Sequence, residues 1–458
     1  MKLQISKNAN INYLAKVINI KSFTSHPNPE VTRMKIAHID GYGICVGINE
    51  PEGWYVYFPV LSQLNPNLLS YLNLYRDKEL NANPEDTPGF FEKNGKVSNI
   101  RLRGFPSEGF LLPYSKLQSW ILSSINIELP DATKELEFDE AEHDGKTFWV
   151  CKKYIVKQTR TPGSGNKRNK RDNKIKQFNK IREDQFHFHY DTIILKKCPH
   201  VIQPNDIIHI SEKIHGTSGI SAYILCHQPL NWKQKIAKWL TGEEFDKYDY
   251  IYASRTVIKN QYYNKNVTPG YYGCDVWAEA DKIVKPHLWK GMSAYYEIVG
   301  FLPNGGYIQK GYDYGCIQPS KDEKYTEGKH FKVRIYRITT VNTEGQIHEW
   351  SAREVQIWCK NNGLTPVTEF YYGYAKDLYK DLDPSEHWTE NFLERLSNDK
   401  NFFMEMNSPS CNNKVPHEGI VIKKENMVSE AFKLKTFKFL GKESEAADKG
   451  ESNIEDES

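Results

Sequence analysis

The chain lacks several features that would place it in a specialised class of protein. No stretch approaches the roughly 18 uninterrupted apolar residues of a membrane span, and the start MKLQISKNANINYL lacks the apolar core of a signal peptide. The formal net charge is only +3 over 458 residues. We therefore expect a protein of the cytoplasm, in a cell or a virus-infected host, with no membrane partner. Any nucleic-acid site must come from local charge.

Motifs for some common kinds of site are also missing. The eight cysteines are scattered singly without a C-x-x-C pair, which argues against a zinc ribbon or a redox pair. His187 and His189 lack the companion ligands that a zinc site needs. No G-x-x-x-x-G-K-[ST] stretch exists, which excludes a phosphate-binding loop of that type. We expect the cysteines to be small apolar residues of the core.

The composition changes along the chain and predicts an α+β protein of two domains with extensions. Over residues 1–150, short β-type runs such as LAKVINI and WYVYFPV alternate with turn signals, and an OB-type β-barrel fits this size. Residues 151–185 are predicted to be a flexible basic linker, since 157–182 carry ten Lys or Arg against one acid. Residues 186–440 are typical of an α+β domain, and 441–458 are predicted to be an acidic, disordered tail.

Local signals predict two helices in the second domain. Ser351 and Glu354 form a capping box and Gly363 a stop, so we expect a surface helix over residues 352–362. A second helix is expected between residues 231 and 242, with lysines among its polar positions. We expect its apolar face to pack on its own domain, and a nucleic-acid contact is the alternative. That face comprises Trp232, Ile236, Trp239 and Leu240.

The first chemical motif is EKIHGTS, residues 212–218, between two predicted strands. A lysine amine becomes a nucleophile only when deprotonated, which requires a positive or desolvated pocket. Gly216 would let the backbone approach a phosphate closely. Lys213 is therefore the candidate nucleophile, although an exposed lysine before a glycine turn would give the same pattern.

Two further segments place charged side chains on predicted strands. Glu297 interrupts the apolar run YYEIVG, so it either has a polar partner in a cleft or is a surface acid at a strand end. Alternation along EGIVIK puts Lys423 on the face opposite Glu418. Lys433 and Lys435 share a face of a neighbouring strand. A polyphosphate would offset their repulsion, and a solvated strand edge is the alternative.

In order and spacing, these segments resemble the motifs of the covalent nucleotidyltransferase superfamily, which contains ATP-dependent DNA ligases, RNA ligases and mRNA capping enzymes. The form K-I-H-G-T-S, with His215 where DNA ligases usually have Asp, resembles RNA ligases. The YASRT segment with Arg255 resembles the arginine motif, and RIYRI around Tyr336 resembles the strand whose aromatic stacks on adenine. The resemblance implies a nucleotidyltransferase domain of ATP-grasp-like antiparallel sheets with helices.

The amino-terminal segments extend this resemblance. The HPNP segment from His26, the Asp40-Gly41 pair and IRLRG from Ile100 look like the OB module that precedes the catalytic domain in one group of RNA ligases. DNA ligases and capping enzymes carry their barrel after the last lysine motif, whereas only 23 residues follow Lys435. From Lys213 to Arg255 the chain advances 42 residues, more than compact RNA ligases need, so an insertion is expected around 231–247.

The resemblance also implies a reaction and a role for each motif residue. Lys213 would attack the α-phosphorus of ATP, and the resulting lysyl-AMP would pass AMP to a 5′-phosphate of RNA, from which a 3′-hydroxyl displaces it. The adenine of ATP would lie near Tyr336 and Glu212, and its ribose near Glu297 and Arg255. The negative charge of its phosphates would be balanced by a divalent cation and by Lys423, Lys433 and Lys435. The remaining roles are Glu418 as a ligand of Mg²⁺ or Mn²⁺, His215 as an orienting group, and Arg101 and Arg103 as nucleic-acid contacts.

Two other functions fit part of this pattern. A DNA ligase would use the same chemistry, although His215 and the missing carboxy-terminal barrel count against it. A non-catalytic RNA-binding protein would use the amino-terminal module alone, but the intact lysine motifs argue for catalysis. We expect a monomeric ligase that seals or repairs RNA, since nothing in the sequence suggests an obligate dimer.

Overall fold

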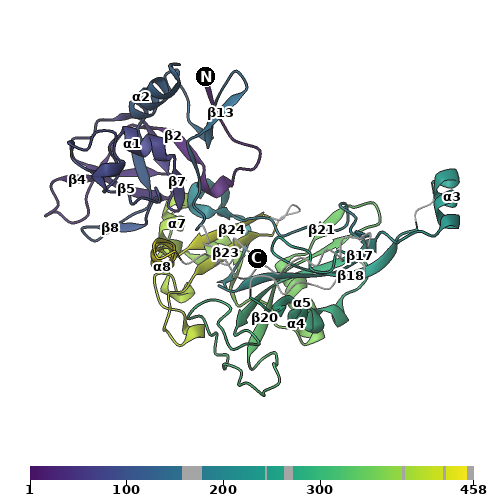
Figure 1. The fold of residues 1–458 in the computed structure, drawn as a ribbon. Coiled ribbons are helices and arrows are strands. Elements are labelled where there is room, and N and C mark those ends of the chain that lie inside the picture. The colour runs from purple at the N-terminus through teal and green to yellow at the C-terminus, as the bar shows by residue number, and fades with distance from the viewer. Residues whose placement is uncertain (157–177, 243–244, 263–271, 384–386, 426–429, 451–458) are drawn as a thin grey trace.

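The computed structural model describes residues 1–156, 178–242, 245–262, 272–383, 387–425 and 430–450. An amino-terminal part built of small sheets lies beside a second part built around two larger sheets (Figure 1). Both parts combine helices with antiparallel strands, so the predicted α+β class is confirmed. Within the described residues, every helix is too short or too polar to traverse a lipid bilayer.

The amino-terminal part pairs its strands in the orders β1-β12-β13, β10-β6-β2-β11, β14-β7, β3-β4-β5 and β8-β9. In the part of the chain that is described, these sheets do not close into one barrel, so the OB-type assignment stays a prediction. The elements are β1 Lys2–Gln4, β2 Ala15–Ile20, β3 Thr24–Ser25, β4 Met34–Ile39, β5 Tyr42–Gly47, β6 Gly53–Phe58, β7 Ser62–Leu64, α1 Pro66–Tyr71, β8 Ile100–Leu102, β9 Phe105–Ser107, β10 Phe110–Pro113, α2 Tyr114–Ile125, β11 Leu136–Phe138, β12 Glu140–His143, β13 Lys146–Trp149 and β14 Cys151–Lys153.

The core of this part forms where alternate strand residues and one helix face meet. Val17 and Val56 are paired across β2 and β6 and are fully buried. Leu117 and Trp120 of α2 belong to the same cluster, so the helix covers the sheet. The alternation of side chains along the strands thus determines which residues are buried in the core.

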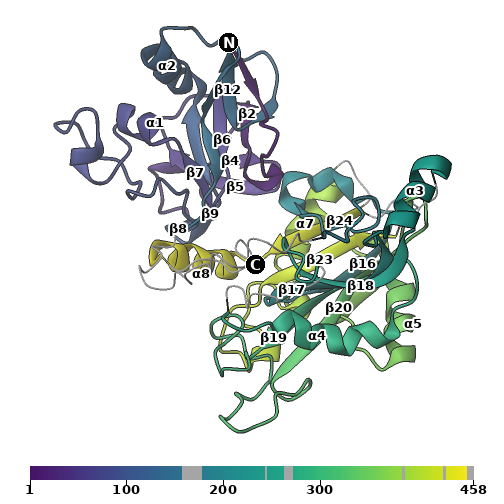
Figure 2. The same ribbon diagram turned by 45° about the vertical axis from the view of Figure 1, so that its right-hand side comes forward.

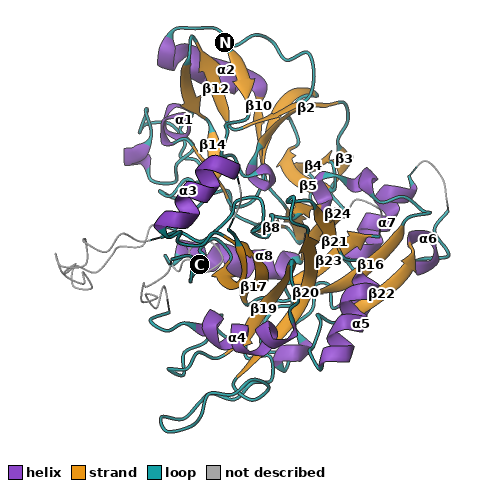
Figure 3. Ribbon diagram, turned by 90° about the vertical axis from the view of Figure 1, so that its right-hand side faces the viewer, coloured by secondary structure: helices purple, strands orange, loops and turns teal. Residues whose placement is uncertain are grey.

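Two five-stranded sheets form the second part, in the orders β15-β24-β23-β16-β22 and β18-β17-β19-β20-β21 (Figures 2 and 3). Except for the parallel pair β15 and β24, neighbouring strands in both sheets run antiparallel. The elements are β15 Ile193–Ile194, β16 Ile207–Lys213, β17 Thr217–Cys226, α3 Trp232–Thr241, β18 Lys247–Ser254, α4 Val276–Val284, β19 Met292–Gly300, β20 Phe331–Val341, β21 Ile347–Glu349, α5 Ala352–Asn362, β22 Glu369–Tyr374, α6 Ala375–Leu378, α7 Trp388–Ser397, β23 Gly419–Lys424, β24 Glu430–Lys435 and α8 Phe437–Asp448.

Helix α5 has the predicted bounds and caps. Ser351 accepts a hydrogen bond from the backbone N–H of Glu354, whose side chain returns a bond to the backbone of Ser351. Gly363 ends the helix in the left-handed conformation. All eight cysteines are free thiols, and five of them are buried, as expected of small core residues.

Helix α3 forms where it was predicted, but its expected packing is wrong. Asn231 and Gln234 cap its amino terminus, and Gly242 ends it. Trp232 and Trp239 of its apolar face remain 69% and 82% exposed. The periodicity predicts the apolar face of α3 correctly. A periodic pattern does not indicate whether another part of the protein packs against that face.

Both ends of the predicted linker, 151–156 and 178–185, lie within the described residues. Cys151–Lys153 form β14 and pair with β7, and most of the basic run, 157–177, lies outside the described residues. The prediction of a flexible segment is wrong for residues 178–182, because Lys180 lies 2.7 Å from Asp249 and Arg182 lies 2.9 Å from Asp246. Tertiary ion pairs order basic residues that local composition marks as solvated.

The prediction of a disordered tail after residue 440 is wrong up to Asp448. Thr436 caps α8, and the side chain of Phe439 is buried. Lys96 of the amino-terminal part donates hydrogen bonds to the carbonyl and hydroxyl oxygens of Ser444, at 2.6 and 2.7 Å. Lys96 also lies 2.9 Å from Asp448. These partners lie far away in sequence, and residues 451–458 are outside the described residues.

Candidate active site

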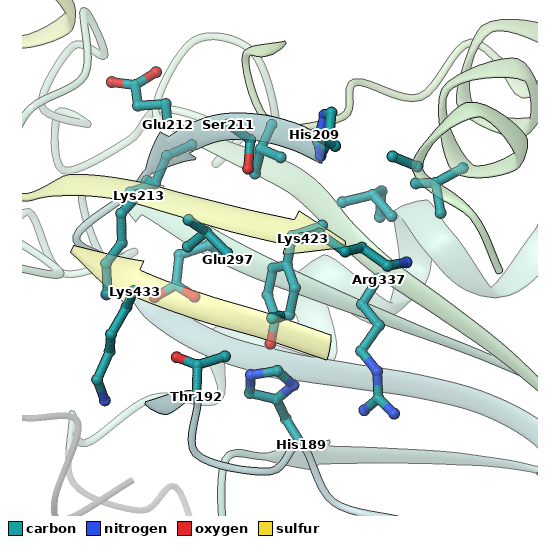
Figure 4. Close-up of a pocket in the computed structure, with 18 of the residues that line it drawn as sticks. His189, Thr192, His209, Ser211, Glu212, Lys213, Glu297, Arg337, Lys423 and Lys433 are labelled. Carbon is teal, nitrogen blue, oxygen red and sulfur yellow. The ribbon is translucent and has the colours of Figure 1, made fainter. Parts of the chain in front are cut away.

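A pocket lies between the two large sheets, and its first wall is a face of β16, β23 and β24 (Figure 4). Lys213 and Lys435 lie on either side of Gly419 in the strand register. Directly paired residues share a face of a sheet, as do alternate residues along a strand. Lys433 is two residues from Lys435 along β24, and Lys423 is four residues from Gly419 along β23. Both therefore lie on the same face of the sheet as Lys213 and Lys435. All four lysines line the pocket.

The opposite wall comes from β17, β19 and β20. The carboxylate of Glu297 accepts a hydrogen bond from the Ser218 hydroxyl at 3.1 Å, and that hydroxyl lies 3.3 Å from the Tyr336 hydroxyl. Glu297 is only 8% exposed. The two alternatives for this acid are thus resolved, because Glu297 has a polar partner and lines a pocket (Figure 4).

Lys213 is the last residue of β16, and an acidic partner, Glu418, comes from just before β23. Its Nζ lies 2.5 Å from Oε1 of Glu418, a carboxylate that is fully buried. The Nζ of Lys435 lies 3.6 Å from the same oxygen. Nδ1 of His215 lies 3.7 Å from Oε2 of Glu418. One buried carboxylate is therefore shared by two lysines and a histidine.

The ring of His215 is held by two aromatic rings. Those of Tyr312 and Phe439 lie edge-on to it, with centroids 4.8 and 4.9 Å away. The backbone N–H of His215 donates to the Tyr314 hydroxyl at 2.7 Å. The histidine of the K-I-H-G motif is fixed beside Glu418 and has little freedom to reorient.

Glu418 was also predicted to bind a divalent cation. Among the described residues, no group of three or more His, Cys, Asp or Glu side chains is arranged to hold a metal. Mg²⁺ and Mn²⁺ do not require such a cage, because they bind one or two carboxylates together with substrate phosphates and water. The single buried carboxylate of Glu418 fits that donor set.

Lys433 and Arg255 meet at a residue that the sequence did not single out. The Nζ of Lys433 lies 2.7 Å from Oδ1 of Asp191, and Nη2 of Arg255 lies 3.4 Å from the same atom. Burial opposes ionisation of Asp191, but the two cations outweigh it and lower its pKa to about 2. Burial lowers the pKa of Lys433, and nearby Lys435 and Lys213 act in the same direction.

Lys423 occupies another part of the pocket. Its ammonium donates to the Trp350 carbonyl and lies 3.8 Å from Glu349, and burial lowers its pKa. Arg337 donates from Nε to both oxygens of Glu349 at 2.9 Å. These two cations share the carboxylate of Glu349. Arg337 is a further pocket residue that the sequence motifs did not identify.

The carboxylate of Glu212 accepts hydrogen bonds from other side chains of the protein. The Thr368 hydroxyl donates to its Oε2 at 2.9 Å, and the Ser410 hydroxyl to its Oε1 at 3.4 Å. His417 lies 3.7 Å away. Burial raises the pKa of Glu212, but these partners outweigh it and the net pKa is lowered. Glu212 borders the pocket, and its predicted contact with adenine remains a prediction.

Tyr336 lies beside His189, a residue that no sequence motif assigns to this site. The ring of His189 lies edge-on to that of Tyr336, with centroids 5.1 Å apart. Burial, together with the nearby Arg337 and Arg255, lowers the pKa of His189 to about 3. His189 is therefore neutral near pH 7. His189 and Asp191 stand just before the apolar run of residues 193–195, but no spacing rule connects them to distant motifs.

Arg101 and Arg103 lie in the amino-terminal part, outside the pocket. The Arg101 guanidinium packs 4.5 Å from the ring centroid of Phe437 and lies 3.8 Å from Glu405. Arg103 occupies the exposed turn between β8 and β9, with φ at 51°. Arg101 therefore helps to join the two parts of the molecule, whereas Arg103 faces solvent. Their predicted contacts with nucleic acid remain predictions.

No protein-family model matches the chain, and no curated protein sequence matches it. Solved structures of the Naegleria gruberi RNA ligase do. The apo form of one variant is 15% identical, with a TM-score of 0.50, over 94% of this chain and 98% of that chain. A variant with ATP and Mn is 13% identical, with a TM-score of 0.48, over 96% and 99% of the two chains. The form with PPi is 13% identical, with a TM-score of 0.49, over 95% and 100%.

The match to the apo structure defines a class of fold. The apo structure aligns with nearly the whole of both chains, so this chain has the fold of an RNA ligase. The expectation drawn from the order of the sequence motifs is confirmed at the level of fold.

Proposed function

We propose that the chain is an ATP-dependent RNA ligase that joins 3′-hydroxyl and 5′-phosphate ends through an enzyme-lysyl-AMP intermediate. The observation that carries this proposal is the register of β16, β23 and β24, which gathers Lys213, Lys433 and Lys435 on one face around Glu418. Three ammonium groups along one wall of a pocket suit a polyphosphate, because a ligand with several negatively charged oxygens can interact with all three at once.

In the first step, Nζ of Lys213 forms a bond to the α-phosphorus of ATP, and the bond to the β-phosphate oxygen breaks to release pyrophosphate. The amine must lose a proton, and Glu418 lies 2.5 Å from it as an acceptor. Lys433 and Lys435 balance the charge on the phosphate oxygens. A divalent cation at Glu418 would supply further positive charge. Tyr336 would stack on adenine, with Glu212 near the base, and Glu297 and Arg255 would bind the ribose.

In the next two steps, the AMP moves to a 5′-phosphate of the nucleic acid, and a 3′-hydroxyl displaces it. Arg103 and the basic segment of 157–182 would supply salt-dependent affinity for the strand. In this proposal, the chain acts as a monomer on RNA nicks or breaks. The Naegleria gruberi structures carry the name RNA ligase and include forms with ATP, AMP, PPi and Mn.

The test is transfer of label from ATP to the protein. Incubation with α-labelled ATP and Mg²⁺ or Mn²⁺ should give a labelled protein that keeps its label through denaturing gel electrophoresis, and Lys213→Ala should abolish it. Lys282→Ala is the matched control, because this exposed lysine pairs only locally with Glu279 at 2.7 Å. An adduct that persists in Lys213→Ala contradicts the proposed nucleophile.

A panel of nicked duplexes separates RNA ligation from DNA ligation. Each strand end at the nick is RNA in one set and DNA in the other. Sealing that requires RNA at the 3′-hydroxyl end supports the proposal. Equal sealing with DNA at that end assigns the chain to DNA ligation instead.

A further inference from the structure

Helix α3 is an insertion that the surrounding hairpin does not need. Strands β17 and β18 pair from Gly219 with Ser254 as far as Cys226 with Lys247. Two residues suffice to join antiparallel strands, yet residues 227–246 lie between these two ends. Figure 1 shows α3 projecting from the rest of the molecule at the tip of this connection.

The helix is stabilised by its own ends. Asn231 accepts a hydrogen bond from the backbone of Gln234 at 2.9 Å, and the Gln234 side chain accepts one from the backbone of Asn231 at 3.0 Å. Gly242 closes the other end in the left-handed conformation, and its N–H donates to Lys238. A capping box and a glycine stop satisfy the end groups that packing would otherwise protect. The helix can thus stand away from a core.

Its apolar face is open to solvent. Successive residues of a helix are about 100° apart, so the four apolar side chains fall within an arc of roughly 100°. They are Trp232, Ile236, Trp239 and Leu240, with exposed fractions of 69%, 48%, 82% and 67%. Scattered exposed apolar residues are ordinary, but a contiguous stripe with two tryptophans marks a contact surface.

Lysines border this stripe on both sides. On the same helical projection, Lys233 and Lys235 flank the apolar arc, and Lys238 lies beyond Lys235. The helix itself, 232–241, contains no Asp or Glu, although Glu243 and Glu244 follow it in the sequence. Lysine stems can lie along an apolar layer while their ammonium groups reach anionic headgroups.

We infer that α3 binds the surface of an anionic lipid membrane, with its apolar face in the headgroup boundary and its axis along the surface. Tryptophan is favoured at that boundary, and aliphatic Ile236 and Leu240 gain by burial in acyl chains. A nucleic acid would stack on the tryptophans but would offer the aliphatic side chains little. With ten residues the helix lies on a membrane and does not cross it.

This inference is independent of the ligase reaction. The four apolar residues are absent from the lining of the active-site pocket. Loss of membrane binding should therefore leave the adenylylation of Lys213 unchanged. Failure of one proposal does not decide the other.

The test is flotation of the full chain with vesicles of phosphatidylcholine alone or with phosphatidylserine added. Wild-type protein should float with the anionic vesicles, and binding should weaken with salt. Trp232→Ala/Trp239→Ala should lower the partition coefficient at least about ten-fold, because both interfacial anchors are lost. Lys233→Gln/Lys235→Gln should lower it by roughly five-fold per charge, but only on anionic vesicles.

The matched control is Ile317→Ala/Ile357→Ala, which removes two apolar side chains that are 60% and 59% exposed elsewhere on the surface. It should bind vesicles like the wild type. Equal flotation of wild type and Trp232→Ala/Trp239→Ala overturns the inference. So does a tryptophan-dependent loss of RNA binding or of self-association in size-exclusion chromatography without any change in flotation.

Discussion

The ammonium of Lys433 lies 2.7 Å from Oδ1 of Asp191, and this carboxylate joins the pocket to the amino-terminal part of the chain. The side-chain amides of Asn10 and Asn12 each donate to Oδ2 of Asp191 at 3.3 Å. Asp191 therefore balances a cation of the proposed phosphate site with one oxygen and binds another part of the molecule with the other. A change in the charge of this pocket should therefore alter the contact between the amino-terminal part and the second part of the molecule.

Asp191→Asn should lower the free energy of unfolding and alter its dependence on pH. The pKa of Asp191 in the folded protein is about 2, below the ordinary 3.8, so its ionised form stabilises the fold. At pH values above the ordinary pKa, this shift stabilises the folded protein by about 2 kcal/mol. The stabilisation is lost as the pH falls through the pKa of Asp191 in the folded protein. Denaturant unfolding at pH 7 should show the loss, and wild type and variant should converge between about pH 4 and pH 2.

The exposed Asp322 supplies a control for that measurement. Asp322→Asn should leave the unfolding free energy within about 0.5 kcal/mol of the wild type. An Asp191→Asn difference that stays constant down to pH 2 would show that the carboxylate charge is not the cause.

Glu443→Ala should slow adenylylation at saturating ATP by about ten-fold, because Lys435 loses the partner that positions it. The Nζ of Lys435 lies 2.9 Å from both oxygens of Glu443 and 3.6 Å from Glu418. Glu443 belongs to α8, the helix that Lys96 of the amino-terminal part holds. Single-turnover labelling measures the rate, and the exposed Glu445→Ala is the control on the same helix. Equal rates for the two variants would remove Glu443 from the positioning of Lys435.

Arg101 and Arg103 should separate into a structural and a nucleic-acid-binding residue. Arg103→Ala should weaken RNA binding without changing stability, and the slope of log K against log salt should fall by about 0.7 to 0.9, as for one lost phosphate contact. Arg101→Ala should instead lower stability by about 0.5 to 1 kcal/mol, because its guanidinium leaves the Phe437 ring. Salt-dependent binding and denaturant unfolding of both variants provide the check. An unchanged slope for Arg103→Ala would contradict the assignment.

The sequence predicts the parts of this molecule that depend on local pattern. Alternation along strands places Lys433 and Lys435 on one face, and the structure confirms it. The capping box at Ser351 gives the start of α5, and Gly363 gives its end. Such signals rest on interactions over a few residues, which a single sequence contains in full.

The residues that the sequence missed act over long distances along the chain. Asp191 is 242 positions from Lys433, and no periodicity or spacing rule connects the two. The same holds for α8, whose acidic composition predicts disorder until Lys96 and its partners are brought together. Composition describes what a segment can do alone, whereas these segments are ordered by contacts that the fold creates.

Gly216→Ala should impair both folding and adenylylation, for a reason different from the one the motif suggests. A Cβ at residue 216 would lie 2.3 Å from the Ile298 carbonyl oxygen and 2.9 Å from Cγ of Glu297. Ordinary carbon contacts are about 3.5 to 4 Å, and the carbonyl belongs to backbone that cannot turn away. Strand β19 must therefore shift relative to the segment that carries Lys213. We expect a loss of about 1 to 3 kcal/mol in stability, as for other overpacked sites, together with weaker lysyl-AMP formation. Denaturant unfolding measures the loss of stability, and ATP labelling measures lysyl-AMP formation.

The control is Gly441→Ala, whose added Cβ meets nothing within 4 Å and which should show neither effect. If Gly216→Ala kept full stability but lost labelling, direct contact between the Gly216 backbone and a phosphate would be the better explanation.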